Sequence, residues 1–181
     1  MRKPMKPLKE IVADLTTVFR QHGFEGATLS KLTEATGLER ASLYHYFPNG
    51  KADMAKNVLK DVLLSLKEDV ISKLDGDSPK ANIENMLKAL DKFYEAGNQL
   101  CFITVFSVGE HDKAISELLR SAITEWTEKL KQNLQKLKVP QAQKVAQQAL
   151  ASIQGALVLS YIQKDRKPFT DALSAIRSSV H

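Results

Sequence analysis

Apolar residues recur every three or four positions along most of the chain, which is the spacing of amphipathic α-helices. The first stretch of this kind runs from about residue 7 to residue 22. Its apolar positions are Leu8, Ile11, Val12, Leu15, Val18 and Phe19. Gly23 is expected to close this helix, and Phe24 is expected to pack back into the same core.

Two short helices are predicted in the next segment. Thr28 is a residue type that caps helix N-termini, and apolar residues follow it at helical spacing until Thr36. Gly37 supplies the left-handed backbone that ends such a helix, and a second helix begins near Arg40 and stops before Pro48. Two helices joined by a short turn with glycine are the layout of a DNA-reading helix-turn-helix, but an ordinary α-hairpin has the same spacing. Both interpretations fit the spacing alone.

Six further helices are predicted downstream, which brings the total to about nine. They cover about residues 51–74, 79–96, 100–106, 111–137, 141–164 and 169–180. The third of these is apolar throughout, so periodicity fits either a buried helix or a strand, and the helical surroundings favour a helix. Ser78 and Pro79 are expected to be the N-cap and the first residue of one helix. The predicted fold class is all-α, with an N-terminal three-helix domain (residues 1–50) and a C-terminal helical domain (residues 51–181).

The composition fits a helical, cytoplasmic protein. The 181 residues are enough to bury a core and correspond to one domain or two small ones. With 8 glycines and 6 prolines, the chain resembles neither a disordered nor an all-β protein. No run reaches the ~18–20 uninterrupted apolar residues of a membrane span, and the N-terminus lacks the apolar core of a signal peptide. The single cysteine, Cys101, excludes an intrachain disulfide and fits a reducing cytoplasm.

The charge balance is mildly basic, with a formal net charge of +5. This value is compatible with a polyanion partner but too small to identify one. Arg2, Lys3 and Lys6 precede the first helix. They form either a solvated tail or a short arm that reaches DNA, and the sequence leaves both open.

Residue patterns for catalysis and for metal binding are missing from the sequence. It contains no glycine-rich phosphate loop and no nucleophile with a base at a recognisable spacing. The four histidines, His22, His45, His111 and His181, are scattered along the chain. We therefore expect a protein that is not an enzyme and that holds no metal ion or other cofactor.

The segment from residue 19 to residue 55 closely resembles the N-terminal domain of TetR-family transcriptional repressors. The resemblance is carried by the Gly23-Phe24 pair, the turn at residues 35–38, the run Leu43-Tyr44-His45-Tyr46-Phe47-Pro48, and Lys51. More weakly, the segments around Cys101, Trp126, residues 153–159 and Pro168-Phe169 resemble the LmrA/YxaF-like branch of this family. The resemblance implies a homodimeric repressor that leaves a palindromic operator in double-stranded DNA when a small effector binds in the C-terminal domain.

The predicted DNA contacts combine side-chain chemistry with this resemblance. Hydroxyls and backbone N–H groups at the start of the first short helix suit a phosphate, and Arg40 can reach a phosphate or a guanine edge. The resemblance implies that Tyr44, Tyr46 and Lys51 grip phosphates. The full predicted set is Thr28, Ser30, Lys31, Arg40, Ala41, Ser42, Tyr44, His45, Tyr46 and Lys51.

Three further predictions concern the C-terminal domain. The residues expected to hold a largely apolar effector are Met86, Leu90, Tyr94, Phe102, Phe106, Ser107 and Trp126, with Glu110 and His111 as a polar anchor. The residues expected at the dimer interface, which the resemblance places on the last two helices, are Leu150, Ile153, Leu157, Tyr161, Leu173 and Ile176. The alternative function is a redox or electrophile sensor that switches through Cys101, although a buried, inert thiol fits its apolar surroundings better.

Overall fold

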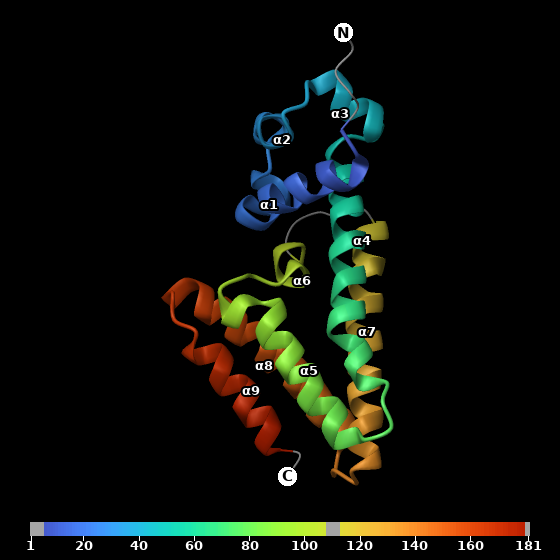
Figure 1. Ribbon diagram of the computed structural model, residues 1–181, viewed down its shortest axis with the longest axis vertical. Coiled ribbons are helices and arrows are strands. Elements are labelled where there is room, and N and C mark those ends of the chain that lie inside the picture. Colours follow the sequence, from blue (N-terminus) through green and yellow to red (C-terminus); the bar gives the residue numbers. More distant parts are fainter. Residues whose placement is uncertain (1–5, 108–112, 180–181) are drawn as a thin grey trace. The chain divides into compact units, whose positions relative to one another are not determined.

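The computed structural model describes residues 6–107 and 113–179, which fold almost entirely into helices (Figure 1). The α-helices are α1 (Leu8–Gly26), α2 (Leu29–Thr36), α3 (Arg40–Tyr46), α4 (Lys51–Asp69), α5 (Pro79–Phe93), α6 (Phe102–Val105), α7 (Lys113–Lys136), α8 (Ala142–Gln163) and α9 (Lys167–Ser178). Two 3-10 helices, η1 (Ile71–Leu74) and η2 (Glu95–Gly97), follow α4 and α5. These two residue ranges contain no β-strand, so the predicted all-α fold with about nine helices is confirmed.

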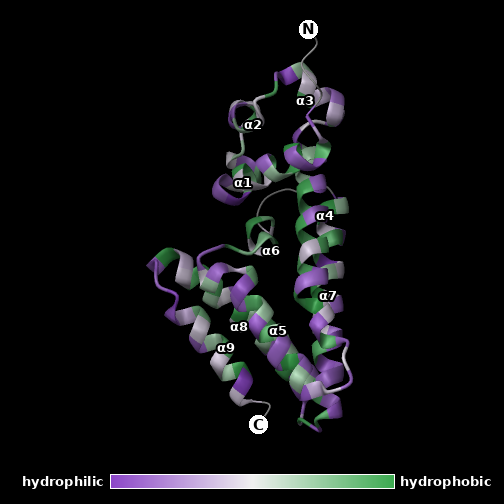
Figure 2. Ribbon diagram, viewed as in Figure 1, coloured by the Kyte–Doolittle hydropathy of each residue, from purple (hydrophilic) through white to green (hydrophobic). Residues whose placement is uncertain are grey.

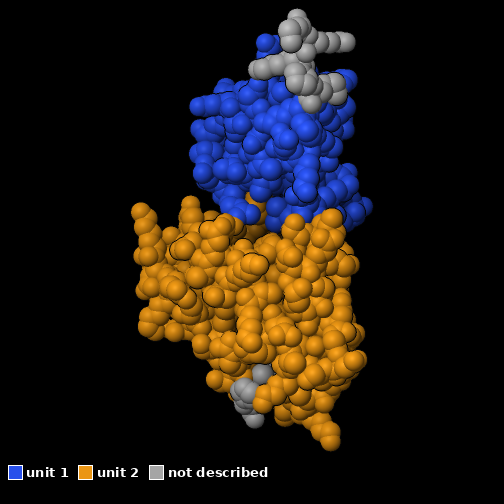
Figure 3. Space-filling model, in the orientation of Figure 1, with its two compact units in different colours: residues 1–62, 105–118 blue, residues 63–104, 119–181 orange. Residues whose placement is uncertain are grey.

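Contacts divide the chain into two compact units (Figure 3). Unit 1 comprises residues 1–62 and 105–118, and unit 2 comprises residues 63–104 and 119–181. Unit 1 thus holds α1, α2, α3 and the first part of α4, together with a segment from the second half of the chain. The predicted domains, residues 1–50 and 51–181, follow chain order and remain a prediction about the division of function.

The core of unit 1 is formed by the apolar faces of its helices. Its buried side chains include Ile11, Leu15, Phe19, Leu32, Leu43, Phe47, Met54 and Leu59. Gly23 interrupts α1, because its φ of 66° and ψ of −177° are not helical, so the predicted helix end is confirmed. Beyond it the Phe24 ring stacks on the Phe19 ring with centroids 6.3 Å apart, so Phe24 does fold back.

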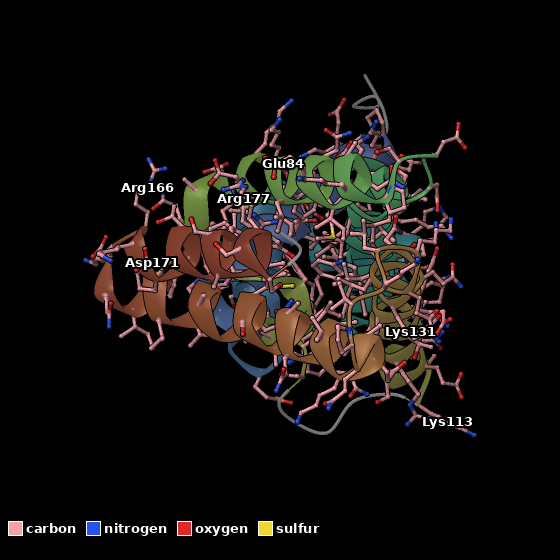
Figure 4. All side chains as sticks on the ribbon, turned by 90° about the horizontal axis from the view of Figure 1, so that it is seen from below. Glu84, Lys113, Lys131, Arg166, Asp171 and Arg177 are labelled. Atoms are coloured by element: carbon pink, nitrogen blue, oxygen red, sulfur yellow. The ribbon has the colours of Figure 1, made fainter. Side chains whose placement is uncertain are left out.

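Unit 2 contains α5, α8 and α9, the C-terminal parts of α4 and α7, the two 3-10 helices and most of α6. Hydrophobic and hydrophilic residues alternate along these helices, as expected when one face of each is buried (Figure 2). α8 packs along α9, and Arg177 of α9 is held to Glu84 of α5 by hydrogen bonds of 2.8 and 3.2 Å (Figure 4). Trp126 of α7 is the largest fully buried side chain.

Within the described chain, α8 is the one helix that is long and apolar enough to cross a membrane, judged by length and composition. A core helix of a water-exposed fold passes the same test. The buried residues of α8 include Ala146, Leu150, Ile153 and Leu157, which face the interior of unit 2. Packing inside unit 2 therefore explains one apolar face of α8. Other apolar residues of this helix are exposed.

The helix predicted over residues 51–74 is wrong at its C-terminal end, because it stops at Asp69 and η1 follows. Two buried asparagines, one from α5 and one from α7, hold the end of η1. The side-chain amides of Asn82 and Asn133 donate to the Leu74 carbonyl at 3.3 and 2.9 Å, and Asn82 also donates to Asn133 Oδ1 at 2.9 Å. The spacing of apolar residues in the sequence does not reveal this pair of buried asparagines.

The ends of α5 differ from the prediction in two details. α5 begins at Pro79 with Ser78 at the N-cap position, as predicted, but the Ser78 side chain makes no capping hydrogen bond. α5 ends at Phe93 instead of Ala96, because Ala96 adopts a left-handed conformation with φ 57° and ψ 32°. The chain then turns through η2 before the short helix α6, which confirms the helix predicted within residues 100–106.

Candidate functional site

The segment from Thr28 to Phe47 forms a helix, a tight turn and a second helix. Thr28 has an extended backbone and its hydroxyl accepts a hydrogen bond from the Lys31 N–H at 3.4 Å, so Thr28 caps α2 as predicted. Gly37 ends α2 in the left-handed region, with φ 65° and ψ 16°. α3 begins three residues later, at Arg40. This is the geometry of a helix-turn-helix, in which the second helix presents side chains to a DNA groove.

α3 presents a polar face to solvent and an apolar face to the core. Its exposed side chains are Arg40, Ala41, Tyr44 and His45, while Ser42 is half-buried and Leu43 is buried. Tyr44 is 43% exposed and its ring lies over Gly50, where a Cβ atom would come within 3.2 Å of Tyr44 Cε1. The exposed face therefore carries a guanidinium, a phenol and an imidazole, which are donors for phosphate oxygens and base edges.

The N-terminal end of α2 offers further hydrogen-bond donors. Thr28 and Ser30 are exposed, and Lys31 is half-buried. The first N–H groups of a helix have no carbonyl partner inside it and attract anions. Here the Thr28 hydroxyl occupies one of them, the Lys31 N–H, and the ammonium group of the same lysine adds positive charge.

Two of the predicted phosphate contacts, Tyr46 and Lys51, already have partners inside unit 1. The Tyr46 hydroxyl donates to the Lys6 carbonyl at 2.8 Å. The Lys51 ammonium lies 4.5 Å from the centroid of the Phe24 ring and 3.8 Å from Glu25 Oε2. Both side chains are half-buried. Sequence analysis missed these contacts because the partners lie up to 40 residues away.

Unit 2 contains a cavity of about 440 Å³ lined mainly by α7 and α8. Its apolar wall consists of Ile103, Ile123, Trp126, Leu150 and Ala151. Its polar wall consists of Thr124, Thr127, Glu128, Gln143, Gln147 and Gln154. None of the described residues that line it is a lysine or an arginine. The cavity thus combines apolar surface with side-chain amides.

The cavity differs from the predicted effector pocket in all but one residue, Trp126. The predicted residues that are instead buried in the cores are Met86, Leu90, Tyr94, Phe102 and Phe106, and Ser107 is exposed. Large apolar side chains at helical spacing fill cores more often than they line open cavities, which explains why the two sets of residues differ. An effector role for the predicted set stays a prediction. The predicted polar anchor, Glu110 and His111, lies outside the described residues.

Three contacts define the walls of this cavity. The indole N–H of the fully buried Trp126 donates to Met86 Sδ at 3.3 Å. The Thr104 hydroxyl donates to Gln154 Oε1 at 3.1 Å, so one wall residue is bonded to α6. A hydrogen bond from Lys131 lowers the pKa of the Glu128 carboxyl, so this wall residue carries a paired negative charge.

Cys101 is buried inside unit 2, where its thiol sulfur accepts a hydrogen bond. Burial raises the pKa of its thiol, although the Tyr94 hydroxyl, which donates to Sγ at 3.0 Å, acts in the opposite direction. Sensor thiols are accessible and have a lowered pKa. The surroundings of Cys101 are therefore those of a structural thiol.

Most residues predicted at the dimer interface are buried within unit 2. These are Leu150, Ile153, Leu157, Leu173 and Ile176, and Tyr161 alone is exposed. A buried side chain packs inside its own protomer, so exposed apolar residues are the ones available to a partner. On α8 the large exposed apolar residues are Leu159, Tyr161 and Ile162, and Ile162 is 71% exposed. Exposed Ala151 and Gly155 continue the stripe of Leu159 and Ile162 at helical spacing.

Within residues 6–107 and 113–179, no group of three or more His, Cys, Asp or Glu side chains is placed to hold a metal ion. The features that carry chemistry in the described chain are thus the exposed face of α3, the start of α2, and the cavity in unit 2. The first two suit a polyanion and the third suits a small organic molecule.

Comparison with protein families matches both halves of the chain. Residues 11–58 match the family described as bacterial regulatory proteins, tetR family. Residues 79–175 match the family described as transcriptional regulator LmrA/YxaF-like, C-terminal domain. The first match covers the helix-turn-helix, and the second covers the cavity and the exposed face of α8.

Individual relatives agree with these families. The HTH-type transcriptional regulator LmrA of Bacillus subtilis is 22% identical over 175 residues, which cover 93% of each chain. The HTH-type transcriptional repressor AcnR of Corynebacterium glutamicum is 42% identical over 45 residues, which cover 25% of this chain and 24% of AcnR.

Solved structures share the fold at low sequence identity. A TetR transcriptional regulator from Legionella pneumophila has a TM-score of 0.82 and 18% identity, with 99% of this chain and 100% of that chain covered. A cysteine mutant of the TetR family regulator CifR, solved with 26bp double-strand operator DNA, has a TM-score of 0.77 and 17% identity, with 99% and 98% covered.

Proposed function

Since the chain belongs to the TetR family of DNA-binding transcriptional regulators, we propose that it is a homodimeric repressor that binds a palindromic operator and leaves it when a small molecule occupies unit 2. The observation that carries this proposal is the capped α2, the glycine turn and the exposed polar face of α3. The proposed activity is binding rather than catalysis, and its proposed site is the cytoplasm, where the operator lies.

Each side chain of the helix-turn-helix is assigned to a base edge or to a phosphate according to its position on α2 or α3. Arg40 and His45 are exposed on α3 and are assigned to base edges or phosphates. Tyr44, held over Gly50, is assigned to a phosphate beside the groove. The start of α2, with Ser30 and Lys31, is assigned to a phosphate on the other side. The small Ala41 and the half-buried Ser42 allow α3 to approach the groove floor.

A dimer is needed because a single module of this size contacts too little DNA for specific binding. Two copies related by a twofold axis place their reading helices in successive major grooves, about 34–36 Å apart. We assign the interface to the exposed stripe of α8 that contains Leu159 and Ile162. Burial of this stripe against a second copy also explains why so much apolar surface lies on one helix.

The effector is assigned to the cavity of unit 2, and its chemistry follows from the walls. Ile103, Ile123 and Trp126 favour a largely apolar molecule, and three glutamine amides can orient it by hydrogen bonds. A ligand that competes for Gln154 would weaken its contact with Thr104 of α6. Release follows only if the ligand binds more tightly to the state that does not hold DNA.

Release requires a route from α6 to the DNA-binding helices. Phe106 follows Thr104 by two residues, and within unit 1 its ring packs on the rings of Phe19 and Phe24 at centroid distances of 5.6 and 6.4 Å. Phe24 in turn supports the ammonium of Lys51. A shift of the α6 backbone would therefore act on side chains that position the helix-turn-helix.

DNase footprinting of the region upstream of the protein's own gene tests the proposed function. We expect protection of one palindromic segment with two half-sites. Ile162→Asp is expected to weaken the dimer by about 100-fold or more, because a charge from each protomer would be buried in the proposed interface, and to abolish the footprint. Sedimentation measures the dimer, and Ser121→Asp, which places the same charge on an exposed position of α7, is the control. Protection that persists with a monomeric Ile162→Asp protein would contradict the dimer assignment.

A further inference from the structure

Lys6 joins the first three helices of unit 1. Its ammonium forms an ion pair with Asp14 of α1 and donates a hydrogen bond to the Thr36 carbonyl of α2 at 2.9 Å. Its main-chain carbonyl accepts a hydrogen bond from the Tyr46 hydroxyl of α3 at 2.8 Å. We call these four residues, Lys6, Asp14, Thr36 and Tyr46, the Lys6 clamp. The clamp gives α1, α2 and α3 one common point of attachment.

The Lys6 ammonium is held by charges and dipoles of the protein itself. Thr36 is the last residue of α2, where carbonyl groups lack helical partners and the helix dipole is negative, so a cation is stabilised there. The buried Thr36 hydroxyl donates to the Leu32 carbonyl at 2.8 Å, so this end of α2 is itself fixed. Asp14 neutralises the ammonium, and the side chains of Lys6 and Asp14 are 28% and 33% exposed. The pair therefore serves as a link between helices.

α3 is a short helix whose direction depends on tertiary contacts. It has seven residues, and Glu39, its N-cap residue, makes no side-chain capping hydrogen bond. Helices of this length are not stable alone in water. The buried Leu43 and Phe47, four residues apart, anchor one side of α3 in the core. A helix held along one side can still roll about that side, and the hydrogen bond of Tyr46 to the main chain of Lys6 opposes this roll.

We propose that the Lys6 clamp sets the roll of α3, so that Tyr46, Lys6 and Asp14 are positioning residues that determine the sequence specificity of operator binding. The Tyr46 hydroxyl then acts through the protein and is not a phosphate ligand. Hydrogen bonds to base edges weaken steeply when they are misaligned, and base edges carry the sequence information. A roll of α3 therefore lowers the preference between sequences more than the overall affinity. The inference rests on the proposed operator binding.

Asp14→Asn separates positioning from plain electrostatics, because the two change different quantities. The substitution removes a negative charge and frees the Lys6 ammonium. Electrostatics alone therefore predicts tighter binding to every duplex, with the ratio of affinities between two sequences unchanged. Loss of the clamp predicts a fall in this ratio. Asp61→Asn removes the same charge from an exposed position of α4 and is the matched control.

The test is a double-mutant cycle on DNA binding, measured by fluorescence anisotropy. The proteins are wild type, Tyr46→Phe, Asp14→Asn, the combination of these two, and the Asp61→Asn control. The probes are a duplex with the footprinted segment and a scrambled duplex of the same composition. The quantity compared is the ratio of the two affinities, which a partly unfolded sample leaves unchanged because it loses binding to both probes alike.

Tyr46→Phe and Asp14→Asn are each expected to lower this ratio by about 10-fold, which is comparable to one mismatched base pair. The combined variant is expected to lose little more than either single variant, because both substitutions act through Lys6. The Asp61→Asn control is expected to keep the wild-type ratio. Thermal unfolding of each variant measures the effect on the fold separately.

Three results would overturn the inference. The first is an equal loss on both duplexes for a folded Tyr46→Phe protein, which would identify the hydroxyl as a phosphate ligand. The second is a wild-type ratio in both single variants, and the third is strictly additive losses in the combined variant. Lys6→Met keeps the main-chain carbonyl but loses both contacts of the ammonium, and a wild-type ratio in this variant would also contradict the clamp.

Failure of the proposed function gives a different result. In that case wild type itself shows no preference between the footprinted and the scrambled duplex. A wild type that prefers the footprinted duplex, together with variants that keep its ratio, would instead leave operator binding intact and remove the positioning role of the clamp.

Discussion

Replacement of Trp126 with alanine is expected to lower the free energy of unfolding by about 3–5 kcal/mol. Trp126 is fully buried in unit 2, and its indole N–H is satisfied by Met86 Sδ. Truncation removes the largest buried side chain and leaves the sulfur without its donor. Because the indole lies beside an existing cavity, few side chains are close enough to fill the space that it would leave.

Urea denaturation followed by circular dichroism measures this change. Ile123→Ala is the matched control, because Ile123 lines the same cavity from the same helix but is 40% exposed. We expect it to cost less than about 1 kcal/mol. A Trp126→Ala protein within about 1 kcal/mol of wild type would mean that unit 2 does not pack around this indole.

Gly97→Ala is the second substitution with a large expected effect, about 2–5 kcal/mol of destabilisation. Gly97 has φ 91°, which an alanine adopts only with strain. A Cβ atom at this position would also lie 2.9 Å from Cβ of the buried Phe169. Strain and overlap add, because neither the backbone of η2 nor the packed ring can move without loss of other contacts.

Gly23→Ala separates these two contributions. Gly23 has φ 66° and ψ −177°, a backbone region almost exclusive to glycine, but a Cβ atom there would have no neighbour within 4 Å, so only backbone strain of about 1–3 kcal/mol is expected. Thermal unfolding of both variants gives the difference that the contact with Phe169 causes. Equal destabilisation of the two variants would contradict the close packing of η2 against α9.

Local signals in the sequence predicted the helix-turn-helix because its geometry is set by neighbouring residues. Thr28 caps α2 by a hydrogen bond to a residue three positions away. Gly37 adopts the left-handed backbone conformation because it has no Cβ atom. The outward face of α3 follows from the position of Leu43 in the core. The contacts that hold η1 after Asp69 could not be predicted locally, because the Leu74 carbonyl accepts a hydrogen bond from Asn133, which is 59 residues away.

The cavity of unit 2 and the exposed apolar residues of α8 could not be predicted in the same way, because apolar periodicity identifies the buried side of a helix. It selected Leu150, Ile153 and Leu157, which face the interior of their own protomer. The cavity walls instead contain Gln143 and Gln154, residue types that sequence patterns assign to solvent. The contacts of Lys6 with Asp14 and Tyr46 were not predicted, because they link residues that are 8 and 40 positions apart.

The central claim is that the exposed face of α3 reads one DNA sequence. The most direct measurement is equilibrium binding of wild type, Arg40→Ala and Tyr44→Ala to the upstream duplex and to a scrambled duplex. We predict tight, salt-sensitive wild-type binding to the upstream duplex. Arg40→Ala should lose about 1–3 kcal/mol of preference between the duplexes, and Tyr44→Ala should weaken binding to both alike. Wild-type binding that is equally weak on both duplexes at physiological salt would contradict the account.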